Sequence, residues 1–236
     1  KIVTKIIFDK DKKKATGVEV IDALNNKTYQ YTAKIIFVCA SSFNSTWLLM
    51  NSATDIWPGG LGSSSGELGH NVMDHHFRTG ASGTAEGFED VYVFGRRPTG
   101  IYIPRFRNIY NDKRDYLRGF GYQGGAGRGR GAEVAEMTIG PALKEALTEP
   151  GKWGIGIMAF GEMLPHHSNK IYLNKTVKDK WRLQVLAMDV EMKENEISMR
   201  KDMMADAAEM LEVAGIKNIN QYDAGYAPGM GIHEMG

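Results

Sequence analysis

Residues 33–52 read AKIIFVCASSFNSTWLLMNS, and this stretch decides which fold the first part of the chain is expected to adopt. Residues 35–38 are apolar without alternation, as expected of a strand that is covered on both faces in a parallel sheet. Residues 47–50 supply the apolar side of a short helix, for which Asn44 and Ser45 are candidate N-caps. The stretch therefore predicts a strand followed by a helix, as in an α/β domain.

The flanking sequence predicts mostly strands. Residues 2–8 and 17–22 are separated by a polar turn, and residues 28–32 alternate as a half-buried strand does. Further on, a loop is expected at 58–69, strands and glycine turns over 77–130, a short helix at 141–148, and strands at 154–161, 171–173 and 183–191. The clearest helix covers residues 196–214 and ends before Gly215. Its expected apolar face consists of Ile197, Met204, Ala208, Leu211 and Ala214, and its methionines, Met203, Met204 and Met210, are expected to fill gaps in the core.

Composition limits the possible functions. The chain has 236 residues, 42% of them hydrophobic, and a net charge of +1, so nothing electrostatic favours nucleic acid as a partner. No apolar run reaches the ~18 residues of a membrane helix, and no signal peptide is recognisable. Because both ends resemble the interior of a longer chain, localisation stays open between cytoplasm and periplasm. Cys39 is alone and is expected to be a small buried hydrophobe.

Several motifs have competing interpretations. The dinucleotide pattern G-x-G-x-x-G is absent, and the glycine-rich residues 125–131 favour a flexible loop over an RGG-like nucleic-acid contact. Histidines are adjacent at 75–76 and at 166–167. Neighbouring residues of a strand point to opposite faces, so neither pair predicts a metal site. Glu162 is expected to be a surface carboxylate. His233 lies between glycines and suits a proton acceptor for a hydroxyl, although its local sequence alone favours a structural turn histidine.

Three segments, taken in order, resemble the glucose-methanol-choline (GMC) oxidoreductases. Residues 33–52 resemble the family's strand, Cys-Ala-Gly or Ala-Ala-Gly turn and apolar helix. Residues 66–75, GELGHNVMDH, resemble its Gly-Arg-Asn-Leu-x-Asp-His segment, and residues 231–236, GIHEMG, resemble its H-x-x-G-T segment. Residues 17–20 and 169–173 also fit family strands. Ser41 stands where many members have Gly, and His70 where many have Arg. The pattern is closer to bacterial sugar-oxidising members and pyranose oxidases than to cholesterol oxidases.

This resemblance implies an α+β protein with FAD as its cofactor. Residues 1–74 would be the later part of a partial α/β FAD-binding domain. Residues 75–227 would form the substrate-binding domain, a six-stranded antiparallel sheet with helices on one face, and residues 228–236 would begin the return to the FAD domain. The implied reaction is oxidation of a CH–OH group of a sugar or other alcohol by hydride transfer to the flavin. The electron acceptor is not identified, and a homo-oligomer is allowed.

The resemblance also assigns site residues. His233 would be the catalytic base, Val3 would meet the adenine through its backbone, and Cys39, Ala40 and Ser41 would pass near the adenosine end. For Val3, a plain strand valine is an equally good interpretation. The family's pyrophosphate motif would precede Lys1 and its second catalytic residue would follow Gly236, so we expect these 236 residues alone to be inert.

A non-catalytic carbohydrate-binding or interaction domain remains the alternative function. Aromatic residues support both hypotheses, because they can stack on sugars or pack in a core. They are Tyr102, Phe106, Tyr122 and Trp153.

Overall fold

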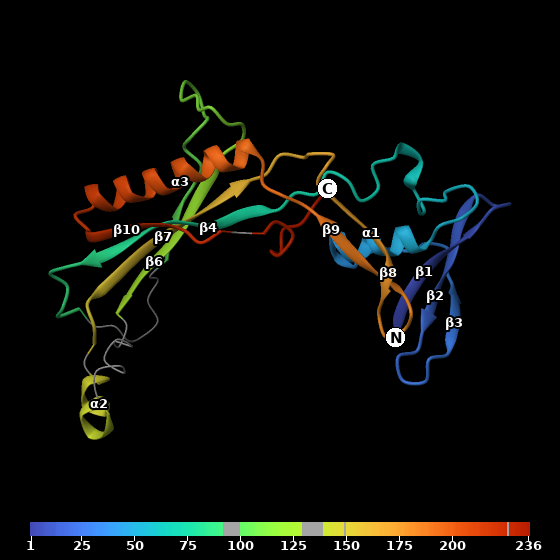
Figure 1. Ribbon diagram of the computed structural model, residues 1–236, viewed down its shortest axis with the longest axis horizontal. Helices are drawn as coiled ribbons and strands as arrows, with labels where there is room; N and C mark the ends of the chain where they lie inside the picture. The colour runs from blue at the N-terminus through green and yellow to red at the C-terminus, as the bar shows by residue number, and fades with distance from the viewer. Residues whose placement is uncertain (92–99, 129–138, 149, 226) are drawn as a thin grey trace. The chain divides into compact units, whose positions relative to one another are not determined.

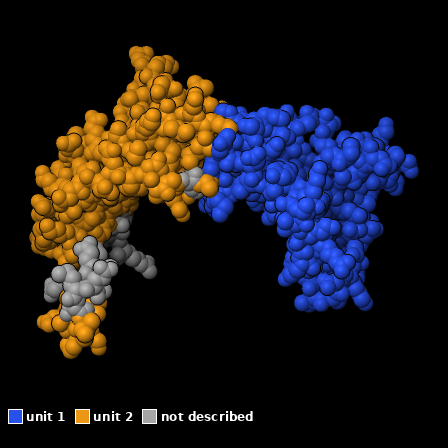
Figure 2. All heavy atoms as spheres, viewed as in Figure 1, with its two compact units in different colours: residues 1–74, 165–191, 228–236 blue, residues 75–164, 192–227 orange. Residues whose placement is uncertain are grey.

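The computed structural model describes residues 1–91, 100–128, 139–148, 150–225 and 227–236, and the chain divides into two compact units (Figure 2). Unit 1 comprises Lys1–Asp74, Pro165–Glu191 and Pro228–Gly236, and unit 2 comprises His75–Leu164 and Met192–Ala227. Residues 165–191, expected in the substrate-binding domain, thus pack with the N-terminal residues. The functional labels of the two predicted domains stay predictions.

Unit 1 is built from antiparallel strands and one helix (Figure 1). Strands β1 (Ile2–Asp9), β2 (Lys14–Ile21) and β3 (Thr28–Thr32) form a sheet in that order, and β8 (Lys170–Lys178) pairs with β9 (Gln184–Asp189). Helix α1 (Ser41–Asn51) packs against β1, and η1 (Ser63–Ser65) is a short 3₁₀ turn. The strands predicted at residues 2–8, 17–22, 28–32, 171–173 and 183–191 are confirmed. Helix α1 is confirmed too, but it begins at Ser41, before the candidate caps.

The prediction of a buried parallel strand at residues 35–38 is wrong. These residues form no strand, and Ile35 and Phe37 are 70% and 82% exposed. A parallel strand covered on both faces needs neighbouring strands, and within the described residues of unit 1 none pairs with this segment. Cys39, expected to be buried, is exposed for the same reason. Strand β3 is exposed along its whole length, so its alternation does not mark a half-buried face.

Unit 2 contains an antiparallel sheet in the order β10-β4-β7-β6-β5. The strands are β4 (His75–Ala85), β5 (Gly100–Ile103), β6 (Phe120–Arg128), β7 (Trp153–Glu162) and β10 (Lys217–Asp223). The α+β class and the antiparallel sheet are as expected, but among the described residues the sheet has five strands instead of six. Helix α2 (Gly140–Ala146) confirms the short helix predicted there.

The glycine-rich segment predicted as a loop is part of strand β6 up to residue 128, and residues 129–131 lie outside the described residues. Its glycines allow neighbouring strands to come close: a Cβ on Gly124 would lie 2.4 Å from the carbonyl oxygen of Gly156 in β7. Glycine is therefore required here because two strand backbones come close together. The glycine-rich composition resembles that of a loop and does not by itself indicate this requirement.

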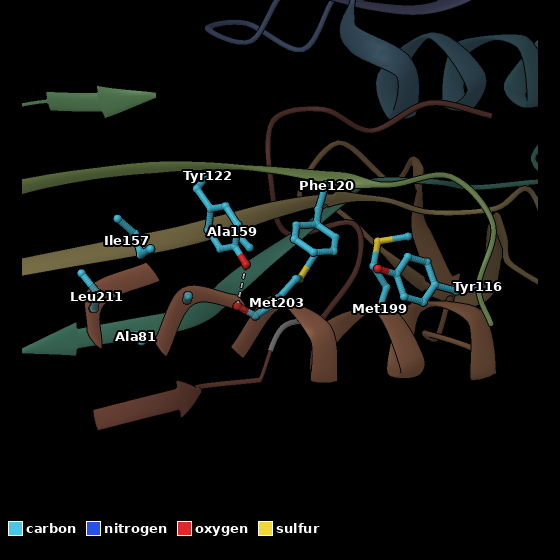
Figure 3. Packing of buried hydrophobic residues seen from close by; sticks show 10 residues of the cluster. Ala81, Tyr116, Phe120, Tyr122, Ile157, Ala159, Met199, Met203 and Leu211 are labelled. Atoms are coloured by element: carbon cyan, nitrogen blue, oxygen red, sulfur yellow. Dashed lines mark hydrogen bonds between the residues drawn. The ribbon is translucent and has the colours of Figure 1, made fainter. Parts of the chain in front are cut away.

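Helix α3 (Glu194–Val213) covers one face of this sheet and closes the core of unit 2 (Figures 1 and 3). Met199 and Met203 are fully buried against sheet residues, and the Tyr122 hydroxyl donates to the Met203 carbonyl at 2.8 Å. The predicted helix and the core role of Met203 are confirmed. The remaining members of the cluster are Ala81, Tyr116, Phe120, Ile157, Ala159, Ala207 and Leu211.

The predicted apolar face of this helix is confirmed in part: Leu211 is buried and Ala208 packs against the core, whereas Ala214 is exposed. Ile197 is 50% exposed, whereas the charged residues Glu196, Arg200 and Asp206 are buried. Each has partners: Glu196 accepts from the Leu164 amide at 3.0 Å, and Asp206 and Arg200 form ion pairs with residues outside the helix. A count of apolar positions cannot recognise a buried face that contains paired charges.

Within unit 2, His76 is a fully buried imidazole in β4. Its Nε2 lies 3.3 Å from the Glu162 carbonyl oxygen, and its Nδ1 has no hydrogen-bond partner among the described residues. Burial, and after it the charge of Arg200, lower the pKa of His76 from 6.5 to about 4, against an opposing effect of Glu196. A proton on Nδ1 would be an unsatisfied buried donor, so the folded state disfavours the protonated imidazole.

We expect unit 2 to lose stability as pH falls from 6.5 towards 4, because the unfolded chain takes up the His76 proton before the folded chain does. The loss attributable to this histidine should be about 2 kcal/mol between about pH 7 and about pH 5. Hydrogen exchange of β4, β7 and α3 amides over this range measures it. His76→Gln should flatten the dependence, and equal slopes for both proteins would contradict the assignment.

Candidate functional site

A cleft of about 830 Å³ lies within unit 1, where the start of β1, residues 36–40, α1 and β9 meet. Most of its lining is apolar, with Trp47 and Phe37 as the aromatic members. Polar groups are few and are contributed by Asn44, Asp179 and Gln184. An apolar cleft with a small number of polar groups is the usual form of a small-molecule site.

The cleft brings together three of the residues predicted to contact FAD. Val3 from β1 and Cys39 and Ala40 from the segment before α1 all line it. Ser41 follows as the first residue of α1. An adenine ring has apolar faces and hydrogen-bonding edges, so the apolar walls and scattered polar groups of this cleft fit the adenosine part of FAD. That these residues contact FAD stays a prediction.

Strand β9 forms a wall of the cleft that the sequence did not indicate. The Trp47 indole Nε1 donates to the Gln184 carbonyl at 2.7 Å and thereby joins α1 to β9. Residues 184–186 line the cleft, although they lie far along the chain from Val3 and Cys39. No local motif marks them, because they enter the site through the packing of the β8–β9 hairpin.

Ser41 has a left-handed backbone, with φ of 63°. This conformation is unfavourable for a residue with a Cβ and is open to glycine, which many GMC members carry at this position. Ser41, which departs from the family pattern, thus has a backbone geometry that suits the glycine of many family members.

We expect Ser41→Gly to leave the thermal stability of the protein equal or higher, since relief of strain offsets the extra freedom of glycine in the unfolded chain. Ser41→Val should be destabilising by about 1–3 kcal/mol. Thr46→Gly, within the same helix, is the control and should be destabilising by about 1 kcal/mol. Thermal unfolding distinguishes these outcomes, and a clear destabilisation by Ser41→Gly would show that strain at this residue is unimportant.

The loop Pro228–Gly236, which carries His233, is held on both sides of that residue. Before it, Asp74 Oδ2 accepts hydrogen bonds from the amides of Gly229 at 3.0 Å and Gly231 at 3.2 Å. After it, Met73 and Met235 exchange backbone hydrogen bonds of 2.7 and 3.0 Å. His233 itself is exposed. His233 is thus an exposed residue of a loop whose backbone is held on both sides.

Helix α1 links this loop to the cleft. The Ser42 hydroxyl, in the first turn of α1, donates to the carbonyl oxygen of Glu234. Ala40, which lines the cleft, lies directly before that turn. The five predicted site residues therefore all lie on unit 1, four around the cleft and the start of α1 and His233 on the adjoining loop. Sequence reasoning assigned no role to Asp74 or Ser42, because their partners are distant in the chain.

The histidine pairs do not form a recognisable metal centre. His76 is buried while His75 is partly exposed, and the His70 ring stacks on His167 with centroids 3.9 Å apart. In the described part of the chain, no three metal-binding side chains come together. Glu162 pairs with Arg105 at 3.4 Å on the surface, as expected. None of the described helices has the length and apolar character needed to cross a membrane.

The aromatic residues that could have served a carbohydrate-binding surface mostly pack inside unit 2. Tyr122 is fully buried, and Phe106 packs against the same core. The indole of Trp153 donates to the Phe88 carbonyl at 2.8 Å, and Tyr102 alone of these four is largely exposed, at 70%. These residues therefore serve packing more than stacking on a ligand.

Comparison with known proteins supports the family resemblance. Residues 1–77 match the family described as GMC oxidoreductase. The chain is 29% identical over 211 residues to the 2-methyl-1,2-propanediol dehydrogenase of Mycolicibacterium austroafricanum, a match that covers 84% of this chain and 37% of that protein. It is 26% identical over 170 residues to the fructose dehydrogenase large subunit of Gluconobacter japonicus, covering 71% and 30%. The matches thus span about a third of each relative's length. These matches and the three segments in order make the chain similar to the GMC oxidoreductases.

Proposed function

We propose that the protein containing this chain oxidises a CH–OH group of a sugar or other alcohol, with FAD as the hydride acceptor and His233 as the base that takes the hydroxyl proton. The observation that carries the proposal is the exposed His233 on a fixed loop, in the same compact unit as the cleft around Val3 and Cys39. When bound, FAD supplies the redox chemistry. The chain supplies the proton acceptor and the cofactor's adenosine site.

The cleft residues have a binding role in this proposal. Val3 would meet the adenine through its backbone, and Cys39, Ala40 and Ser41 would lie along the adenosine. Asn44, Asp179 and Gln184 are the polar groups in the cleft that could bind the adenine edge or the ribose hydroxyls. These contacts depend on shape and backbone, so single side-chain changes at Val3 should affect FAD affinity only slightly.

A polyol is the proposed substrate class. The two relatives are named for 2-methyl-1,2-propanediol and for fructose, both of which carry neighbouring hydroxyl groups. Turnover should be measured with a dye as electron acceptor on sugars, 1,2-diols, aliphatic monoalcohols and choline. We expect activity on sugars or diols; activity confined to monoalcohols or choline would contradict the substrate class.

Cys39 offers a direct test of the cofactor site, because its thiol is exposed and lines the cleft. In the complete protein, bound FAD should slow alkylation of Cys39, followed by mass spectrometry of its peptide, and removal of FAD should restore the rate. Equal rates with and without FAD would refute adenosine binding in this cleft. A purified protein that neither contains nor takes up FAD would instead favour a carbohydrate-binding or interaction domain.

A further inference from the structure

Asp74 is a buried carboxylate that holds the loop carrying His233. The residue is 2% exposed, and its Oδ2 accepts from the Gly229 and Gly231 amides at 3.0 and 3.2 Å. Hydrogen bonds to an ionised acceptor are stronger than those between neutral groups. A single oxygen thus fixes two amides just before His233, across more than 150 residues of sequence.

The geometry of the loop depends on this oxygen. Gly229 has φ of 86°, and a Cβ there would lie 2.3 Å from Met188 Sδ, so the chain passes close to β9 in a conformation suited to glycine. Loss of the carboxylate would leave two backbone amides without their acceptor in a partly buried position. On the other side of His233, the Met73–Met235 bridge would still hold the loop. Only the loop residues that precede His233 would lose their anchor.

We propose that Asp74 is the positioning residue for His233: it acts through the backbone of residues 229–231 and sets where the imidazole meets the substrate hydroxyl. The proposal rests on the proposed role of His233 as base. Asp74 need not contact substrate or flavin. Misplacing a catalytic group by about 1 Å can lower a rate by as much as about 10²-fold, so such a residue can affect the rate strongly without taking part in the chemistry.

Asn169 provides a matched control. It is 1% exposed, lies in the same unit, and also makes two hydrogen bonds to backbone: its Nδ2 donates to the Glu191 carbonyl at 3.0 Å, and its Oδ1 accepts from the Glu191 amide at 3.2 Å. These bonds tie residue 169 to the end of the β8–β9 region, whereas those of Asp74 tie the His233 loop. Asn169→Ala therefore removes two side-chain hydrogen bonds to backbone without releasing that loop.

The experiment compares Asp74→Ala, Asp74→Asn, Asn169→Ala and His233→Ala in the complete FAD-containing protein. Flavin content, thermal stability, kcat, KM and the rate of flavin reduction by substrate are measured for each. Asp74→Ala should lower flavin reduction per bound FAD by about 10- to 100-fold with little change in KM. Asp74→Asn should recover most of that rate, because its Oδ1 can still accept from both amides. Asn169→Ala should lower stability and leave the rate per bound FAD unchanged.

The outcomes separate the inference from the proposed function. If His233→Ala abolishes reduction while Asp74→Ala retains the normal rate per bound FAD, the positioning role is overturned and the proposed function stands. If Asp74→Ala and Asn169→Ala lower the rate equally, or the loss follows FAD content alone, Asp74 is only structural and the inference fails. If His233→Ala remains active, the base assignment itself fails.

Discussion

Replacing His233 with alanine is expected to lower the rate of flavin reduction by about 10²- to 10⁴-fold while the protein retains its FAD. In hydride transfer from an alcohol, the hydroxyl proton must leave as the C–H hydride departs, and a neutral imidazole is suited to accept it near neutral pH. His233 is exposed, and its loop is anchored by Asp74, Met73 and Ser42. The side chain can therefore be removed without removing any of these backbone anchors.

Stopped-flow measurement of flavin reduction under saturating substrate checks this result, with FAD absorbance as the measure of cofactor retention. His167→Ala is a suitable control, because His167 is another exposed histidine of the same unit and its ring stacks on His70. It should leave the rate unchanged. Turnover of His233→Ala within a few-fold of the parent protein would refute the assignment of the base.

The second large effect concerns the buried ion pair of unit 2. Arg200 has a side chain that is 5% exposed, with Nε 3.0 Å from Asp223 Oδ2 and Nη2 paired to the other carboxylate oxygen. Its Nη1 donates to the Phe77 carbonyl at 3.0 Å. In Asp223→Ala, the buried guanidinium of Arg200 would lose both carboxylate oxygens. Of the partners named above it would keep the neutral Phe77 carbonyl. We expect a loss of about 3–5 kcal/mol in the free energy of unfolding of unit 2.

The reverse change should be milder. Arg200→Met removes the buried charge and fills much of its volume, and the Asp223 side chain, 36% exposed, can then be hydrated. Asp223→Ala should therefore be the more destabilising of the two variants. Glu162→Ala, which breaks a surface pair with Arg105 at 3.4 Å in the same unit, should change stability by less than about 1 kcal/mol. Hydrogen exchange of α3 and β10 measures these effects, and a greater loss from Arg200→Met would contradict the explanation.

The local elements of this protein were largely predictable from its sequence. The turn between β1 and β2, the three N-terminal strands and helix α3 follow from patterns that span a few residues, because turn chemistry and side-chain periodicity act over that range. The order of three segments, ending in residues 231–236, likewise sufficed to indicate the resemblance to the GMC family and to nominate His233 as base, a role that stays a prediction. These conclusions need no knowledge of which distant residues touch.

Only the tertiary structure decided which of these features are buried and which residues act together. Residues 35–38 have the composition of a buried strand yet lie exposed, because burial requires neighbouring strands. The buried face of α3 includes Arg200, since its partner Asp223 comes from β10. Asp74 acquires a partner at Gly229, and Trp47 acquires one at Gln184, through contacts between segments far apart in the chain. Sequence periodicity shows how a residue contributes to its own helix or strand. The stability of the Arg200–Asp223 ion pair, or of the loop held by Asp74, depends on a second segment that the local sequence does not specify.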